Sequence, residues 1–301
     1  MINFEQISTK DKALFNKLAN ACSQRGCEMS FANLFLWGDQ KIAYLNEHLV
    51  FLSTFSKSFY PFPMGDEKDV ENKIAVINEI IKDSKERGIP CMITAVCQAE
   101  KEFLEKHFEN RFDFETNDGS YDYVYDINDL ADLLGKKYHK KRNHLNNFKK
   151  AHPNYTVEPI SEQNKNKVIQ MVENWYKQKV EATKEDDFDY ERVVFNRAMD
   201  NYSELELEGL VLKDGEEIFG VTFASPFYQD VLDVHFEKAR ADVDGAYVAI
   251  NNEFAKYIRE KFPQIKYLDR EEDMGLEGLR KAKQSYFPHH QVVKYRALLK
   301  E

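Results

Sequence analysis

The stretch from Glu208 to Phe262 constrains the fold most, because it contains the signals of a whole sheet-and-helix unit. Asp214-Gly215 separates the apolar runs 210–212 and 218–221, and Asp-Gly between two apolar runs is the strongest local signal for a β-hairpin. A third strand is expected at 231–236, and apolar residues then recur at helical spacing from Ala246. We therefore expect a three-stranded meander that leads directly into a helix. The N-terminus of that helix suits an anionic or carbonyl group of a donor.

The chain of 301 residues is long enough for two domains. The first half of the chain is expected to contain helices, then a hairpin, then strands that alternate with helices. The second half repeats this order of elements. A basic helix is expected between them, from Asp132 to Ala151. We predict an α+β protein with α/β-type mixed sheets: two similar domains, residues 1–130 and 156–301, joined by a linking helix within 131–155.

The charge is unevenly distributed along the chain. The net charge is −10, yet residues 136–150 hold seven Lys or Arg and no acidic residue. One interpretation is a solvated linker helix whose cations balance the acidic domains. The other is a docking site for a polyanion such as an RNA acceptor stem, a phospholipid head group or a nucleotide pyrophosphate. The candidate binding residues are Lys136, Lys137, Lys140, Lys141 and Arg142.

Three titratable side chains alternate along the expected strand at 231–237. Alternation places Asp233, His235 and Glu237 on one face of the strand and apolar side chains on the other. They are candidates for the general base that deprotonates an attacking amine or hydroxyl. The alternative is a polar sheet face without a catalytic role.

A second polar cluster follows the apolar strand at 265–268, where binding loops of α/β sheets gather. It runs from Asp269 to Lys283 and includes Arg270, and Arg280 and Lys283 lie three residues apart on one helix face. Together they are candidates to grip a carboxylate or phosphate, with Tyr286 as a proton donor to a leaving group. For each charge taken singly, the alternative is surface ion pairing.

Metal binding and membrane spanning are not expected. The four cysteines lack Cys-x-x-Cys spacing and histidine partners, which predicts reduced thiols and no metal. The N-terminal residues do not show the charged segment followed by an apolar run that is typical of a signal peptide, and the chain has no long uninterrupted apolar run. We therefore expect a cytoplasmic protein. Peripheral association with a membrane surface is compatible with this interpretation.

Several motifs together resemble an uncharacterised bacterial family related to the C-terminal domain of phosphatidylglycerol lysyltransferase (DUF2156-like), within the tandem GNAT, or acyl-coenzyme A N-acyltransferase, superfamily. The carrying segments are 30–37 (SFANLFLW), 60–65 (YPFPMG), 140–146 (KKRNHLN), 245–251 (GAYVAIN), 269–275 (DREEDMG) and 278–283 (GLRKAK). The resemblance implies two GNAT-like domains and transfer of an acyl or aminoacyl group. In the lysyltransferases the donor is a charged transfer RNA and the acceptor is a lipid.

The donor stays open between an acyl-coenzyme A and an aminoacyl-tRNA, and no permanently bound cofactor is expected. The donor-binding loop would include Arg240, Gly245 and Ala246. It is one residue longer than the acyl-coenzyme A pattern and lacks that pattern's first glycine, and Asp242 and Asp244 would repel a pyrophosphate. The alternative to a transferase is a non-catalytic binding protein on a duplicated GNAT scaffold.

Overall fold

The computed structural model describes residues 1–22, 24–37, 39–54, 57–183 and 189–300. The chain divides into two compact units. Unit 1 comprises Met1–Asp122, Glu272–Arg280 and Gln291–Glu301, and unit 2 comprises Tyr123–Glu271 and Lys281–His290. The chain therefore passes between the units four times.

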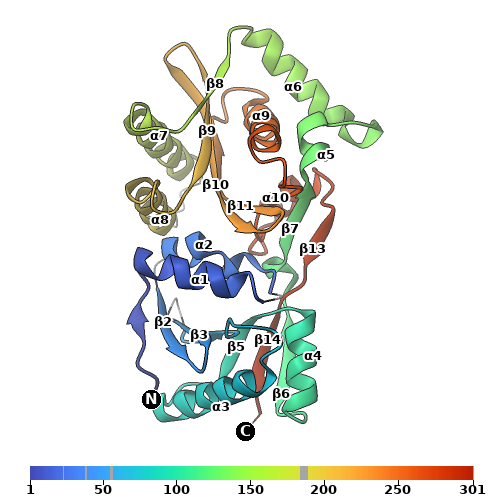
Figure 1. The fold of residues 1–301 in the computed structure, drawn as a ribbon. Coiled ribbons are helices and arrows are strands. Elements are labelled where there is room, and N and C mark those ends of the chain that lie inside the picture. The colour runs from blue at the N-terminus through green and yellow to red at the C-terminus, as the bar shows by residue number, and fades with distance from the viewer. Residues whose placement is uncertain (23, 38, 55–56, 184–188, 301) are drawn as a thin grey trace. The chain divides into compact units, whose positions relative to one another are not determined.

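Unit 1 contains a three-stranded sheet, β1-β2-β3, and a four-stranded sheet in the order β4-β5-β14-β6 (Figure 1). Its strands are β1 (Glu5–Gln6), β2 (Gln40–Leu45), β3 (His48–Ser53), β4 (Tyr60–Pro61), β5 (Met92–Val96), β6 (Phe112–Thr116) and β14 (Tyr295–Leu299). Its helices are α1 (Lys12–Ala19), α2 (Phe31–Leu36), α3 (Val70–Arg87) and α4 (Gln98–His107), with short 3-10 turns at Thr9–Asp11, Cys27–Met29 and Asp118–Ser120.

Helix α3 begins and ends at residues whose chemistry favours helix termini. The side chain of Asp69 accepts a hydrogen bond from the backbone N–H of Asn72, which caps the first turn. Gly88 ends the helix with φ 68°, a left-handed conformation that glycine adopts without strain. Between these ends, Val76, Ile77 and Ile80 are fully buried in the core of unit 1.

Unit 2 is built on a seven-stranded sheet in the order β13-β7-β12-β11-β10-β9-β8. Its strands are β7 (Asp122–Asp126), β8 (Thr156–Pro159), β9 (Glu208–Asp214), β10 (Glu217–Tyr228), β11 (Val231–Ala239), β12 (Tyr267–Asp269) and β13 (His290–Val292). Its helices are α5 (Ile127–Asp132), a 3-10 turn (Lys136–Tyr138), α6 (His139–Ala151), α7 (Lys165–Thr183), α8 (Asp189–Asp200) and α9 (Ala246–Lys261); α10 (Glu277–Gln284) crosses the boundary between the units.

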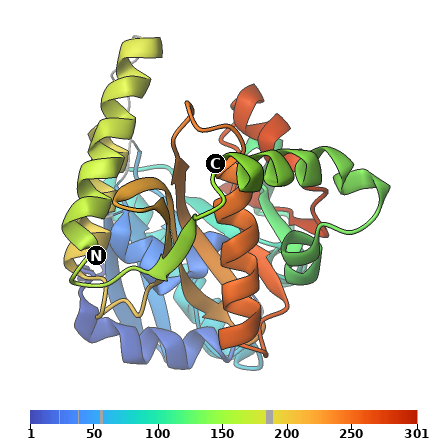
Figure 2. The same cartoon turned by 90° about the horizontal axis from the view of Figure 1, so that it is seen from above.

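The meander and helix expected from residue 208 onward form the centre of unit 2. β9, β10 and β11 are consecutive antiparallel neighbours, and β11 also pairs with β12 in parallel. Helix α9 covers one face of this sheet, and α7 and α8 lie on the other (Figure 2). The buried face of α9 includes Ile250, Phe254 and Ile258, which join the main apolar cluster of the unit.

The C-terminal segment differs from its expectation. The sequence predicts that the second domain runs from residue 156 to the C-terminus. In the structure this segment forms two strands, β13 and β14, in different sheets. β14 pairs with β5 and β6 and completes the sheet of unit 1. Periodicity cannot reveal this exchange, because both strands have ordinary strand composition and their partners are distant in sequence.

Candidate active site

The candidate site of unit 2 lies where two parallel strands stop pairing. β11 and β12 pair over three residues only, from Val231 with Tyr267 to Asp233 with Asp269. β11 continues to Ala239, whereas β12 ends at Asp269. Beyond Asp233, β11 therefore pairs with β10 alone among the described strands. Polar side chains from β11, from α9 and from the loop after β12 gather beside this unpaired edge.

An ion pair holds the centre of this group. Arg270 Nη2 donates a hydrogen bond to Glu237 Oε1 at 2.8 Å, and Asn251 Nδ2 donates to Glu237 Oε2 at 3.1 Å. The side chains of Arg270 and Glu237 are 14% and 11% exposed, so the pair is largely removed from water. Burial opposes the charge of Arg270, but the carboxylate of Glu237 overrides it and raises the arginine pKa. The arginine is therefore held in its charged form.

Aromatic rings and a lysine complete the group. The Arg270 guanidinium lies 5.2 Å from the ring centre of Tyr286 and 5.6 Å from that of Tyr125. Lys141, from α6, places its ammonium 3.7 Å from the ring centre of Tyr286. Burial, and then the charge of Arg270, lower the pKa of Lys141 to about 8. A lysine with this pKa exchanges its proton close to neutral pH.

Two buried polar atoms of the group have no hydrogen-bond partner among the described residues: Arg270 Nη1 and Asn251 Oδ1. The Lys141 ammonium likewise has no hydrogen bond or ion pair within the described part of the chain. Native proteins satisfy nearly all buried polar atoms, and exceptions are typical of sites that bind a further group. Two unsatisfied donors and one unsatisfied acceptor around Glu237 make this group, here called the Glu237 cluster, the candidate ligand site of unit 2.

The predicted base residues do not share one face, because β11 contains a β-bulge. Phe223 pairs with Phe236 while its neighbour Ala224 pairs with Val234, which leaves His235 as the extra residue. Val234 and Ala239 consequently pack in the same apolar cluster although they are five residues apart. The bulge thus turns Glu237 to the α9 face and leaves Asp233 on the other.

His235 belongs to a separate polar group on that other face. Its Nε2 lies 2.8 Å from Ser225 Oγ, and its Nδ1 lies 3.2 Å from Glu271 Oε1 and 3.5 Å from Asp233 Oδ2. The side chains of His235 and Asp233 are 3% and 0% exposed. The structure therefore brings Asp233 and His235 together and separates them from Glu237.

The residues predicted to bind substrate are also divided. Arg270 and Tyr286 lie in the Glu237 cluster. Lys283 supports the loop beneath it by donating to the carbonyl oxygens of Arg270 and Glu271, the latter at 3.0 Å. Arg280, three residues away, instead pairs with Asp273 at 2.8 Å and Asp118 at 3.1 Å in unit 1. Arg280 and Lys283 consequently do not form the predicted anion grip.

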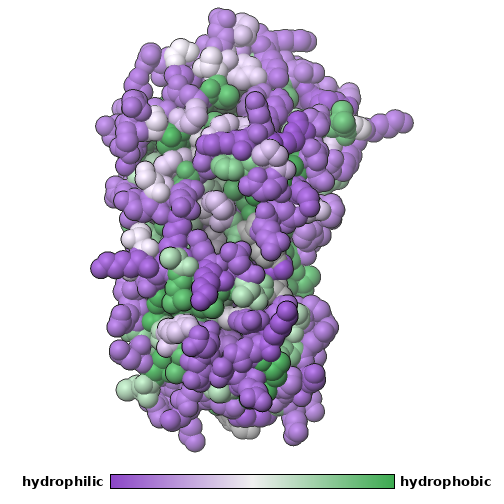
Figure 3. Space-filling model, in the orientation of Figure 1, coloured by the Kyte–Doolittle hydropathy of each residue, from purple (hydrophilic) through white to green (hydrophobic). Residues whose placement is uncertain are grey.

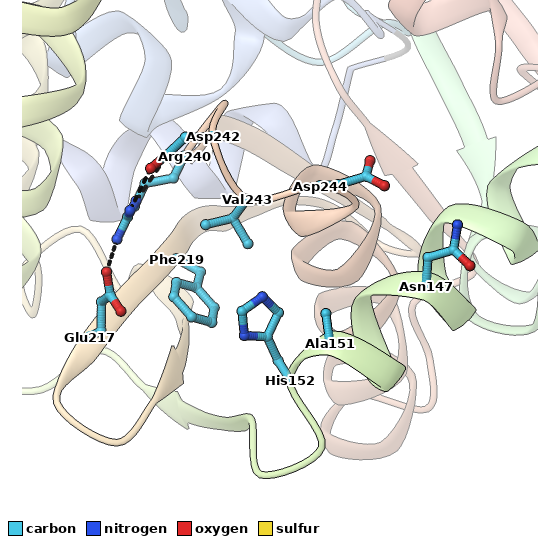
Figure 4. Close-up of a pocket in the computed structure, with 9 residues that line it drawn as sticks. All are labelled: Asn147, Ala151, His152, Glu217, Phe219, Arg240, Asp242, Val243 and Asp244. Carbon is cyan, nitrogen blue, oxygen red and sulfur yellow. Dashed lines mark hydrogen bonds and ion pairs between the residues drawn. The ribbon is translucent and has the colours of Figure 1, made fainter.

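The predicted donor loop lines a pocket of about 350 Å³ at the start of α9 (Figure 4). Arg240 is engaged there by two carboxylates, those of Glu217 and Asp242. A Cβ added to Gly245 would lie 2.6 Å from the carbonyl oxygen of His144, so α6 packs directly on this turn. Ala246 is 1% exposed. The N-terminus of α9 is covered by α6, and the pocket beside it is rich in carboxylates.

The five predicted polyanion-binding cations have different environments. Lys136, Lys137 and Lys140 are exposed, although Lys137 pairs with Asp129 at 2.9 Å. Arg142 donates to the carbonyl oxygens of Leu133 and Gly135, which fixes the preceding turn. Lys141 points inward to Tyr286. The helix thus presents an exposed basic surface and contributes one cation to the Glu237 cluster.

Sequence reasoning missed Asn251 and the role of Lys141. Asn251 and Asn252 are adjacent on the apolar side of α9 and are 3% and 2% exposed. Asn252 donates to the carbonyl oxygens of Leu130 and Ala131, which ties α9 to α5. Two amides within a buried helix face signal a polar function, because each must find hydrogen-bond partners. Nothing in the sequence distinguishes Lys141 from the exposed lysines next to it, so its inward position could not be predicted.

Two groups of described side chains have the spacing of metal ligands: Asp233, His235 and Glu271 in unit 2, and Cys27, Glu28 and Asp122 in unit 1. In the unit 1 group, the ammonium of Lys294 lies 2.8 Å from Asp122 Oδ1 and 2.9 Å from Glu28 Oε2. That ammonium supplies the positive charge that a metal would bring. The expectation of no metal stays a prediction.

The family model for "Phosphatidylglycerol lysyltransferase, C-terminal" matches residues 19–298. The chain belongs to this family. The resemblance drawn from the sequence motifs is thereby confirmed, and the lysyltransferase C-terminal family is part of the acyltransferase superfamily. A search of curated proteins finds no match to the chain.

Solved structures share the fold of this chain. A conserved protein of unknown function from Bacteroides thetaiotaomicron VPI-5482 is 34% identical, with a TM-score of 0.92 and 100% of both chains covered. L-PGS from Bacillus licheniformis is 17% identical, with a TM-score of 0.72 over 100% of this chain and 94% of that one. A tandem GNAT protein from the clavulanic acid biosynthesis pathway is 7% identical, with a TM-score of 0.53 over 100% and 99%. The predicted tandem GNAT-like fold is confirmed.

No helix in the described part of the chain combines the length and apolar character needed to cross a membrane.

Proposed function

We propose that this protein is an aminoacyltransferase that moves an aminoacyl group from an RNA ester to an amine or hydroxyl acceptor, and that the Glu237 cluster binds the aminoacyl group. The observation that carries the proposal is the set of unsatisfied buried atoms, Arg270 Nη1 and Asn251 Oδ1, beside the Lys141 ammonium. An aminoacyl ester offers complementary groups: an ammonium to donate hydrogen bonds and a carbonyl oxygen to accept them.

In the proposed complex, the α-ammonium of the donor binds between Glu237 and Asn251 Oδ1. The ester carbonyl then accepts hydrogen bonds from Arg270 Nη1 and from the side-chain nitrogen of Lys141, which starts the reaction as the neutral amine. These two donors stabilise the negative charge that develops on that oxygen when the acceptor attacks the carbonyl carbon. Their fixed positions among buried rings strengthen the effect, because little water screens the charges.

Proton transfer is assigned to Lys141 and not to His235. The bond from the acceptor to the carbonyl carbon forms, and the bond from that carbon to the ribose oxygen breaks. The proton of the acceptor passes to the neutral amine of Lys141, and the ammonium that results gives it to the departing ribose oxygen. A lysine with a pKa of about 8 has both forms available near neutral pH. The bulge places His235 and Glu237 on opposite faces of the sheet. On its own face, His235 contacts Ser225 and Glu271.

The donor is proposed to be an RNA ester and not a coenzyme A thioester. Coenzyme A needs free backbone N–H groups and positive charge for its pyrophosphate. Here α6 covers the start of α9, and Arg240 is already paired with Glu217 and Asp242. The exposed cations of the basic segment, among them Lys140 and Lys150, suit the phosphates of an RNA.

The test compares aminoacylated transfer RNAs with acetyl-coenzyme A. We expect calorimetry to show salt-sensitive binding of a charged RNA and weak or absent coenzyme binding. Deacylation or transfer should be lost in Arg270→Met and Lys141→Met and kept in Arg259→Met, which removes a more exposed arginine paired with Asp132. Tight coenzyme binding would refute the donor assignment. Full activity of both site variants would refute the site, and binding of neither donor would favour a non-catalytic role.

A further inference from the structure

Polar side chains gather inside unit 2 on the face of the sheet opposite to Glu237. On the outside of a protein such side chains need no special role, because water solvates them, and the face shown in Figure 3 is largely hydrophilic. The group around His235 is buried instead. The side chains of Asp233, His235 and Glu271 are 0%, 3% and 16% exposed, and Ser225 is 2% exposed. Carboxylates in a protein interior are paired with a cation or bind a metal.

The distances within this group fit metal ligands better than a charged hydrogen bond. His235 Nδ1 lies 3.2 Å from Glu271 Oε1 and 3.5 Å from Asp233 Oδ2, and the three ligand atoms all lie within 4.8 Å of one another. A hydrogen bond between an imidazolium and a carboxylate is shorter, about 2.7–2.9 Å. Ligand atoms about 2.0–2.1 Å from a tetrahedral Zn²⁺ lie about 3.3–3.4 Å apart, whereas those of an octahedral Mg²⁺ lie about 2.9 Å apart. The spacing therefore favours zinc, with one nitrogen and two oxygen ligands.

The second nitrogen of His235 is held in the way that a metal-binding histidine requires. Its Nε2 lies 2.8 Å from Ser225 Oγ. When Nε2–H donates to this hydroxyl, the lone pair of Nδ1 faces the carboxylates of Asp233 and Glu271 and can bind a metal. His235 is also the extra residue of the β-bulge, and bulges commonly re-aim a side chain beside a functional site. The bulge and Ser225 thus both support a ligand role for His235.

Glu271 is fixed at the position of the third ligand by its own backbone. Its N–H donates to Asp269 Oδ1 at 2.8 Å. Its carbonyl oxygen accepts from the N–H of Tyr123 at 3.1 Å and from the Lys283 ammonium at 3.0 Å. These bonds hold Glu271 at φ 58°, a conformation that costs free energy for a residue other than glycine. A carboxylate held in this way loses little further freedom when it binds a metal.

We propose that Asp233, His235 and Glu271 bind a Zn²⁺ ion that joins β11 to the loop after β12. The backbones of these strands stop pairing after Asp233, and the ion would link them just beyond that point. Arg270 directly precedes Glu271, so the same link would fix the arginine of the Glu237 cluster. The expectation of no metal rests on the cysteines, whereas His235 and Glu271 are 36 residues apart and meet only in the folded chain. The proposal does not depend on the transfer chemistry.

The experiment is equilibrium dialysis of the full chain against Zn²⁺, followed by metal analysis and competition with a colorimetric chelator. We expect one Zn²⁺ per wild-type chain, a higher melting temperature with Zn²⁺ than with EDTA, and the visible absorption bands of a tetrahedral site when Co²⁺ replaces Zn²⁺. His235→Gln and Glu271→Gln should each weaken Zn²⁺ binding by roughly a hundredfold or more, and Ser225→Ala by roughly tenfold. His290→Gln and Glu260→Gln are the matched controls, because both residues are exposed.

Each alternative predicts a different result. A wild-type chain that binds no Zn²⁺ would overturn the proposal, as would binding that survives both ligand variants. Loss of binding in Cys27→Ser but not in Glu271→Gln would assign the ion to the unit 1 group, and loss in His290→Gln alone would show an adventitious ion only. If His235→Gln does not fold, weaker binding by Ser225→Ala and a tetrahedral Co²⁺ spectrum decide the question. Zn²⁺ binding is measured without any donor, so it can fail while the proposed function holds.

Discussion

The ammonium of Lys141 lies 3.7 Å above the centre of the Tyr286 ring, on the side of α6 that faces the interior of unit 2. The same ring lies 5.2 Å from the guanidinium of Arg270. One tyrosine ring therefore contacts two cations, of which Lys141 is half-buried and Arg270 is largely buried. Charge placed in this way costs stability, and such a cost is typical of residues retained for binding or catalysis.

Replacing Lys141 by Met should make the protein more stable at neutral pH. The pKa of Lys141 is lowered to about 8 by burial and by Arg270, so between this value and about 10.5 the unfolded chain binds the extra proton. Wild-type stability should rise with pH across that window. After allowance for partial solvent screening, we expect Lys141→Met to gain about 1–2 kcal/mol near neutral pH.

Urea unfolding of Lys141→Met and wild type, near neutral pH and in the alkaline range, measures this difference. Lys140→Met is the control, because Lys140 is exposed on the same helix. Parallel pH profiles for wild type and Lys141→Met would contradict the assignment.

Removing one member of the Arg270–Glu237 pair should cost more than removing both. Glu237→Leu leaves a buried guanidinium unpaired, which costs about 3–5 kcal/mol. The double variant Glu237→Leu/Arg270→Leu removes both charges and should be more stable than either single variant. A double-mutant cycle by chemical denaturation gives the coupling. Additive losses would show that the pair is not coupled in solution.

Alanine at Gly245 should destabilise unit 2 strongly. Gly245 has φ 80°, and an added Cβ would lie 2.6 Å from the His144 carbonyl oxygen and 2.9 Å from Phe148 Cβ. We expect a loss of about 2–4 kcal/mol, from the left-handed backbone and the clash with α6 together. Gly88→Ala isolates the first cause: φ is 68°, nothing lies within 4 Å, and about 1 kcal/mol is expected. Equal thermal shifts for the two variants would contradict close packing of α6 on this turn.

Lys294 should be essential to the fold of unit 1. It is 4% exposed and contacts the carboxylate of Asp122, which is fully buried. Burial opposes its charge, but Asp122, Cys27 and Glu28 override this effect and raise the lysine pKa. Lys294→Met leaves the carboxylates of Asp122 and Glu28 without this counter-charge and should cost about 3–5 kcal/mol. Adding Asp122→Asn should restore part of the loss, measured by urea unfolding. A milder effect of Lys294→Met than of an exposed control, Lys106→Met, would refute this role.

Local sequence patterns predicted much of unit 2 because the interactions concerned are local. The Asp214-Gly215 turn and its flanking apolar runs specify the β9–β10 hairpin, and the spacing from Ala246 specifies α9. Signals at both ends of α3 are equally local, since Asp69 caps its own first turn and Gly88 supplies a left-handed residue. The motifs that begin at residues 245 and 269 identified the family for the same reason, because each is a contiguous run that can be recognised without knowing the tertiary structure.

The sequence by itself determined these elements, the basic character of α6 and the family. Only the tertiary structure decided which side chains meet. The bulge at His235 depends on pairing with β10, so alternation within β11 wrongly grouped it with Glu237. Lys141 and Lys140 are adjacent and chemically identical, and only packing against Tyr286 turns one inward. β14 belongs to unit 1 because it pairs with β5 and β6. These partners lie nearly two hundred residues earlier, and no local pattern in the sequence records a pairing over such a separation.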